Sequence, residues 1–135
     1  RDVPSIRLPD SAFDASLRDA GRALRSYAPV SWWRPGSGWV DSTMIAIATR
    51  HGYRCALGSV YPYDPAIPSV TFASRYILAN ARPGAVIVLH DRGDRGRRTA
   101  RTLSRVLPTL TQRGLRVVTL SEMLRLSDAG ARGTR

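Results

Sequence analysis

The stretch Ala85-Val86-Ile87-Val88-Leu89 decides the fold class, because all of its residues are apolar and His90-Asp91 follows directly. A strand that is apolar throughout, rather than alternating apolar and polar residues, is typical of a parallel sheet covered on both faces. The Pro83-Gly84 turn precedes it. We therefore predict a buried parallel strand over residues 85–89, with the polar pair at its carboxyl end.

Helix and strand patterns alternate on both sides of this stretch. Apolar residues recur at three- and four-residue steps in the predicted helices, whereas short apolar runs bounded by Gly and Pro predict strands. The predicted helices are one from Ser11 that ends before Pro29, residues 40–50, 69–81 and 97–112, and a short one opening at residues 121–124. The predicted strands are residues 30–33, 53–57, 85–89 and 115–120.

Strands that alternate with helices at about thirty residues per unit indicate parallel β-α-β architecture, and hence an α/β fold. A closed (β/α) barrel needs about eight strands and roughly 200 to 250 residues. The 135 residues of this chain supply about half of one. A small open α/β sheet is the alternative. We expect the domain to cover residues 1–126, followed by a disordered tail over residues 127–135.

The charge of the chain raises the question of a polyanionic partner. All 21 basic residues are arginine, against 10 acidic residues, for a net charge of +11. Arginine binds phosphate in a bidentate manner, so a basic nucleic-acid-binding α/β module is one interpretation. The arginines are spread along the chain and dense only between Arg92 and Arg105, which favours a compositional bias. We therefore do not expect nucleic acid as the partner.

Cysteine content and hydropathy limit the remaining classes. Cys55 is the only cysteine, so the chain has no intrachain disulfide. The longest apolar run, residues 85–89, is far shorter than the ~20 residues of a membrane span, and no membrane partner is expected. The compartment stays unknown.

Polar residues follow three of the predicted strands. Arg34 follows residues 30–33, Asp64 follows residues 53–57, and His90 follows residues 85–89. Reactive groups of parallel α/β sheets gather at the carboxyl ends of the strands. We therefore predict that these three side chains face one opening, where His90 transfers protons near neutral pH. The alternative for His90 is a strand cap that only makes backbone hydrogen bonds.

Other polar residues favour structural roles. His51 precedes Gly52 at a predicted helix end, where a basic ring complements the helix dipole. Asp91 is expected to cap the following loop, with orientation of His90 as the alternative. Residues 92–98 are expected to be a solvated loop leading into a helix, with binding of phosphate or a polyanion as the alternative. The tryptophans Trp32, Trp33 and Trp39 flank an Arg-Pro-Gly loop; aromatic rings beside a groove suit the apolar faces of sugars, and at least one of the three is expected in the core.

The motifs of a complete hydrolase are missing. Two histidines, one cysteine and no His-x-x-His spacing cannot assemble a zinc site from these residues. No Gly-x-Ser-x-Gly elbow and no glycine loop for phosphate is present. No metal ligand can therefore be named in this chain.

Taken in order, the residues at the strand ends resemble the later motifs of the polysaccharide deacetylase family, carbohydrate esterase family 4. Its Arg-Pro motif resembles residues 33–38 (WRPGSG). Its Asp-Trp motif is partly matched by residues 58–65 (GSVYPYDP), where Asp64 takes the aspartate and Pro65 replaces the tryptophan. Its Leu-x-His motif is present in shifted form as residues 88–91 (VLHD), and residues 114–121 resemble its closing strand and helix.

The resemblance implies the C-terminal part of a distorted (β/α) barrel that removes N-acetyl groups from an amino-sugar polymer or oligomer. A divalent metal, usually zinc, polarises the acetamide carbonyl and activates water in such enzymes. The two motifs that carry the metal ligands are absent and are expected to precede Arg1, in an N-terminal half of the same domain. This chain alone is therefore expected to be inactive; a non-catalytic, carbohydrate-binding relative is the other interpretation.

The resemblance also implies roles for single residues. His90 is the acid toward the leaving amine, Asp64 orients it, and Arg34 holds the catalytic aspartate by a charge-assisted hydrogen bond. Leu89 lines the pocket for the acetyl methyl group. Trp39 and Pro35 are expected at the glycan substrate.

Overall fold

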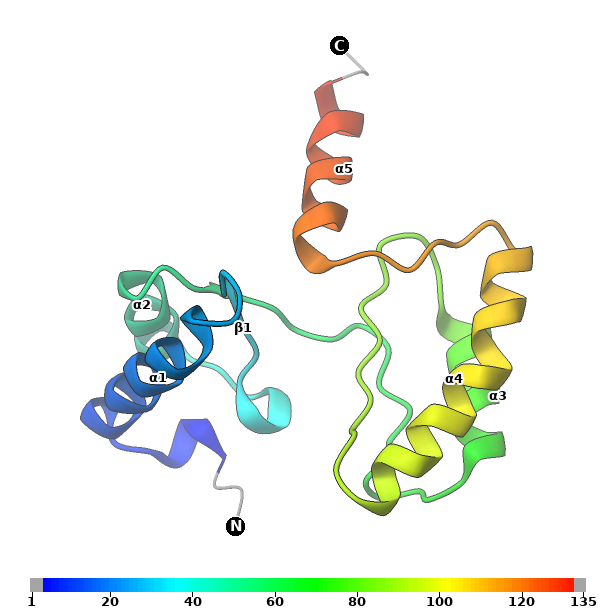
Figure 1. Cartoon of the computed structure of the whole chain (residues 1–135), viewed down its shortest axis with the longest axis horizontal. Coiled ribbons are helices and arrows are strands. Elements are labelled where there is room, and N and C mark those ends of the chain that lie inside the picture. Colours follow the sequence, from blue (N-terminus) through cyan, green and yellow to red (C-terminus); the bar gives the residue numbers. More distant parts are fainter. Residues whose placement is uncertain (1–3, 133–135) are drawn as a thin grey trace. The chain divides into compact units, whose positions relative to one another are not determined.

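The computed structural model describes residues 4–132, with side chains described through residue 129. The chain divides into two compact units, residues 1–57 and residues 58–135. The elements follow one another as η1 (Ser5–Arg7), α1 (Asp10–Arg25), β1 (Trp32–Trp33), η2 (Gly36–Gly38), α2 (Ser42–Arg50), β2 (Arg54–Cys55), α3 (Val70–Asn80), α4 (Asp94–Gln112) and α5 (Leu120–Arg132) (Figure 1).

The first unit packs α1 and α2 together beside the parallel pair β1 and β2, in which Trp32 pairs with Arg54 and Trp33 with Cys55. α2 begins where the Asp41 carboxylate accepts a hydrogen bond from the Met44 N–H at 2.8 Å, which satisfies one of the free donors of a helix start. Six buried side chains of this unit form one cluster: Phe13, Leu17, Met44, Ile47, Ala48 and Tyr53.

The second unit contains α3 and α4, which lie side by side (Figure 1). Its buried cluster consists of Val60, Ile77, Val106 and Leu110. Val60 and Ile87 form a parallel bridge, in which the Val88 N–H donates to the Val60 carbonyl at 2.9 Å. The segment that leads to Asp64 and the segment that leads to His90 therefore run in the same direction, as the sequence predicts for parallel strands.

The helices agree with the sequence more closely than the strands do. Residues 85–89 make a single bridge rather than a continuous strand. The predicted strand over residues 115–120 is wrong: no strand is assigned there, and α5 begins at Leu120. A strand exists only where a neighbouring backbone pairs with it. An apolar run indicates burial but does not supply that neighbour.

Two boundaries also differ from the sequence prediction. α4 begins at Asp94, so most of residues 92–98 belongs to the helix and not to a loop. Asp94 lies in the first turn, where its negative charge complements the helix dipole. α5 continues to Arg132, so residues 127–132 are helical, whereas the last three residues of the predicted tail lie outside the described residues. None of the helices in the described part of the chain has the length and apolarity to cross a membrane.

Candidate active site

Asp64 and His90 form a hydrogen-bonded pair in the second unit. Nδ1 of the His90 ring lies 2.9 Å from Oδ1 and 3.1 Å from Oδ2 of Asp64. The backbone N–H of His90 also donates to Oδ2 of Asp64, at 3.0 Å. The Asp64 side chain is only 10% exposed, whereas the His90 side chain is 29% exposed. One buried carboxylate thus holds both the ring and the backbone of a histidine that still reaches solvent.

The backbone around Tyr63 brings the Asp64 carboxylate to this position. Tyr63 has a positive φ of 55°, which is uncommon for a residue other than glycine. Its carbonyl accepts hydrogen bonds from the N–H groups of Ala66 at 2.9 Å and Ile67 at 2.7 Å, which close a tight turn. Pro62, just before it, is fully buried. Asp64 therefore lies in a turn that is held by the hydrogen bonds of the Tyr63 carbonyl and by the buried Pro62.

The pairing with Asp64 decides which ring nitrogen of His90 is available for proton transfer. An ionised carboxylate can only accept hydrogen bonds, so Nδ1 of His90 carries the proton that points at Asp64. Nε2 is then the ring nitrogen that the Asp64 contact does not use. In the neutral ring Nε2 accepts a proton, and in the charged ring it donates one.

α4 also contacts His90, through the backbone carbonyl of that residue. The Thr99 hydroxyl donates a hydrogen bond to the His90 carbonyl at 2.5 Å. Gly96, one turn earlier, lies so close to the Asp91 backbone carbonyl that a Cβ there would overlap it. Sequence reasoning missed both residues, because neither belongs to a strand end or to a motif. The backbone carbonyl of Asp91 is the group that faces Gly96, and the loop cap expected of Asp91 stays a prediction.

Two further residues lie at the pair. The Tyr61 ring stands edge-on to the His90 ring, with 6.1 Å between the ring centroids. Leu89 lines a small pocket beside Asp64, together with Val70 and Thr102. Leu89, predicted at the acetyl group, is thus adjacent to the carboxylate that orients His90.

The remaining predicted site residues belong to the first unit. Arg34 is exposed directly after β1, and its approach to His90 stays a prediction. Trp39 is 67% exposed and therefore open to a ligand. Pro35 is fully buried, so it supports the loop by packing and has no surface for a substrate, contrary to the prediction. Trp33 packs on Phe13, with 5.2 Å between ring centroids, and is the tryptophan that contributes to the core.

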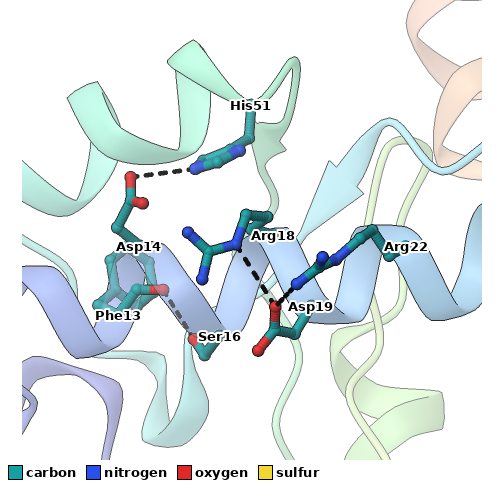
Figure 2. Close-up of polar contacts among 7 residues, drawn as sticks. All are labelled: Phe13, Asp14, Ser16, Arg18, Asp19, Arg22 and His51. Atoms are coloured by element: carbon teal, nitrogen blue, oxygen red, sulfur yellow. Dashed lines mark hydrogen bonds and ion pairs between the residues drawn. The ribbon is translucent and has the colours of Figure 1, made fainter.

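His51 has a structural partner. It follows the end of α2, and its Nε2 lies 3.0 Å from Oδ1 of Asp14 on α1 (Figure 2). Arg50 approaches the same oxygen at 3.4 Å. This contact ties α1 to α2 through Nε2, whereas His90 is bound through Nδ1. The sequence predicts a structural role for His51 through the helix dipole, and the contact with Asp14 is a further interaction that the sequence did not reveal.

The described residues do not offer a metal site. No group of three or more His, Cys, Asp or Glu side chains lies together among them. Burial raises the pKa of the Cys55 thiol, and the hydrogen bond from Arg22 lowers the pKa of Asp19 on α1.

Known proteins resemble this chain in sequence. No family model matches it. The peptidoglycan-N-acetylglucosamine deacetylase of Bacillus cereus is 35% identical over 95 residues, which cover 69% of this chain and 45% of that protein. The chitooligosaccharide deacetylase of Bradyrhizobium sp. is 31% identical over 119 residues, which cover 77% of this chain and 54% of that protein. The chain thus spans about half the length of the curated relatives it matches.

Solved structures resemble it in fold. The peptidoglycan deacetylase PdaC from Bacillus subtilis matches with a TM-score of 0.81 at 20% identity, over 96% of this chain and 62% of that one. A CE4 family pseudoenzyme from Bacillus anthracis matches with a TM-score of 0.77 at 20% identity, over 87% of this chain and 41% of that one.

The fold is therefore that of a portion of a CE4 deacetylase, a distorted (β/α) barrel with parallel strands and many helices. The deacetylase relatives and the CE4 structures together support a CE4 polysaccharide deacetylase-like C-terminal fragment, which is the resemblance that the motifs predict.

Proposed function

We propose that the protein to which this chain belongs hydrolyses N-acetyl groups of an amino-sugar polymer or oligomer, with His90 as the general acid. The observation that carries the proposal is the buried Asp64 carboxylate, which binds both the ring and the backbone N–H of His90. The names of the two relatives support the reaction class, since both are deacetylases of N-acetylated amino sugars.

The geometry suits proton delivery to a leaving amine. When the C–N bond of an acetamide breaks, the departing nitrogen needs a proton. Nε2 of His90 supplies it, because Nδ1 is held by Asp64. The Asp64 carboxylate stabilises the positive charge of the ring before transfer, while Thr99 and Asp64 fix the backbone on either side of the residue. The ring therefore needs no reorientation during the reaction.

The family implies a divalent metal, usually zinc, and the residues described here do not fit it, because they contain no set of three ligands. We propose that its ligands lie elsewhere in the full-length protein. In the same proposal Arg34 holds a catalytic aspartate that is also supplied from elsewhere, and the exposed Trp39 contacts the glycan.

Acetate release from N-acetylated glucosamine oligomers by the full-length protein tests the role of His90. The variant His90→Gln is expected to lose about a hundredfold to ten-thousandfold in kcat, the usual contribution of a general acid. His51→Gln is the matched control, because His51 is also paired with an aspartate but serves to join α1 and α2. Equal rates for His90→Gln and the unaltered protein would remove His90 from the mechanism.

A non-catalytic carbohydrate-binding relative is the second candidate. One structural neighbour at a TM-score of 0.77 is a pseudoenzyme, so the fold by itself does not carry activity. This candidate predicts that the full-length protein binds N-acetylated glycans without releasing acetate, with or without added zinc. Acetate release by the unaltered protein would exclude it.

A further inference from the structure

A row of four aromatic rings leads away from His90. The Tyr61 ring, next to His90, lies 5.0 Å from the Tyr63 ring, between centroids. Tyr63 lies 5.9 Å from Tyr76, and Tyr76 lies 6.0 Å from Phe72. Tyr61 and Phe72 are each 38% exposed and Tyr63 is 47% exposed, whereas Tyr76 packs against the second core. The rings therefore form a continuous surface that starts at the proposed acid.

The backbone holds one ring of this row in an unusual conformation. Tyr63 has a φ of 55°, and bulky residues adopt this left-handed region rarely. Such conformations persist where the surrounding structure enforces them, and they concentrate at ligand-binding and active sites. Here the enforced conformation presents an aromatic side chain to solvent rather than burying it.

A groove on α3 continues the row. Phe72 and Tyr76 line it together with polar side chains, among them Thr71, Arg75 and Asn80. The Thr71 hydroxyl also accepts a hydrogen bond from Arg105 of α4 at 3.2 Å. Aromatic faces suit the apolar faces of sugar rings, and a few polar groups placed around them suit the hydroxyl and amide groups. The groove offers both kinds of contact on one helix.

We propose that Tyr61, Tyr63, Tyr76, Phe72 and the adjoining α3 groove bind a stretch of glycan several sugar units long, away from the N-acetyl group that reacts. The position of the reacting sugar rests on the proposed function, whereas the binding itself does not require catalysis. The proposal commits to a carbohydrate, because the row is continuous with His90 and the groove alternates aromatic and hydrogen-bonding side chains.

Calorimetric dissociation constants of the full-length protein for N-acetylglucosamine disaccharide and hexasaccharide test the proposal. Phe72→Leu removes a ring but keeps apolar volume, and Tyr63→Gly removes a ring while accepting the positive φ. Each variant is expected to bind the hexasaccharide roughly threefold to tenfold more weakly, with a smaller change for the disaccharide. Phe72→Tyr is expected to keep the hexasaccharide affinity.

Tyr27→Leu is the matched control, since Tyr27 is 88% exposed in the first unit and outside the row. The ratio of the two dissociation constants should stay unchanged in this variant. An unchanged ratio in both Phe72→Leu and Tyr63→Gly, with thermal unfolding as for the unaltered protein, would overturn the proposal. His90→Gln separates the two proposals, because it should abolish acetate release but leave the ratio intact; retained release would contradict the general acid alone.

Discussion

Asp64 is shared between two groups of one residue, the ring and the backbone N–H of His90. A single carboxylate therefore sets the ring direction and holds the local backbone. His51 also pairs with an aspartate, but through the opposite ring nitrogen and between two helices. The nitrogen left available, and not the presence of a carboxylate partner, distinguishes the two histidines.

Asp64→Asn is expected to lower kcat of the full-length protein by roughly tenfold to a hundredfold, because a hydrogen bond to a charged group contributes about 1.5–3 kcal/mol. The amide retains one acceptor oxygen but lacks the negative charge that stabilises the protonated ring. Deacetylation kinetics and the nitrogen chemical shifts of the His90 ring measure the effect. Asp14→Asn is the control; an Asp64→Asn enzyme with the kcat of the unaltered protein would contradict the role given to the carboxylate.

Cys55 is expected to react slowly with iodoacetamide. Burial raises the pKa of its thiol, so at a given pH below that pKa the folded protein holds less thiolate than an unfolded chain does. Alkylation followed by mass spectrometry should be slower for the native protein than in denaturant, and should accelerate as the pH rises. A native rate equal to the denatured rate would show that the thiol is not shielded.

Sequence reasoning found Asp64 and His90 because it placed them after predicted strands, residues 53–57 and 85–89. In the structure the segment directly before Asp64 pairs with residues 85–89 instead, through the bridge between Val60 and Ile87. It could not find Thr99, since that hydroxyl meets His90 only after α4 folds back onto the preceding loop. It also placed Pro35 at the substrate because of its motif position, although the side chain is fully buried. Residue type and order indicate which groups share an edge, but not which of them stay exposed.

At the scale of elements, the helices were predictable because their end signals are local. Asp41 caps α2, and the positive φ angles of Gly52 and Gly114 follow the ends of α2 and α4. Strands lack such local signals, because each depends on a partner that is distant in sequence. Residues 85–89 pair with another segment at one bridge, to Val60, and residues 115–120 form no β-ladder within the described chain.

Asp41→Ala is expected to lower the free energy of unfolding by about 1 kcal/mol, since it removes the hydrogen bond to the Met44 N–H. Urea denaturation followed by circular dichroism measures it. Asp10→Ala is the matched control, because Asp10 begins α1 but no side-chain cap bond is recorded there. Equal losses in the two variants would attribute the effect to charge near the helix start and not to capping.

Ile77→Ala on α3 is expected to cost about 2–5 kcal/mol, because the side chain is 0% exposed within the second buried cluster. Leu107→Ala on α4 is the comparison, since Leu107 is 38% exposed. Denaturant titration should show the larger loss for Ile77→Ala. The reverse order would mean that the assigned core does not stabilise the second unit.

At the scale of the whole molecule, the net charge of +11 sets the affinity for polyanions. Binding of the chain to duplex DNA is expected to stay in the non-specific range, roughly 10⁻⁴ to 10⁻⁶ M at physiological salt, and to weaken steeply as salt is added. Fluorescence anisotropy at several salt concentrations measures it. A nanomolar, sequence-dependent affinity would instead support the nucleic-acid-binding module.

The position of His90 depends on Gly96, a residue that has no reactive group of its own. Glycine within a helix ordinarily weakens it, and replacement by alanine ordinarily strengthens it by about 1 kcal/mol. Here the added methyl group would press on the Asp91 carbonyl and displace the residue next to the histidine. Replacement of Gly96 by alanine would therefore stabilise α4 in isolation but misalign the His90 imidazole. Helix stability and alignment of the reactive ring are in conflict at this position.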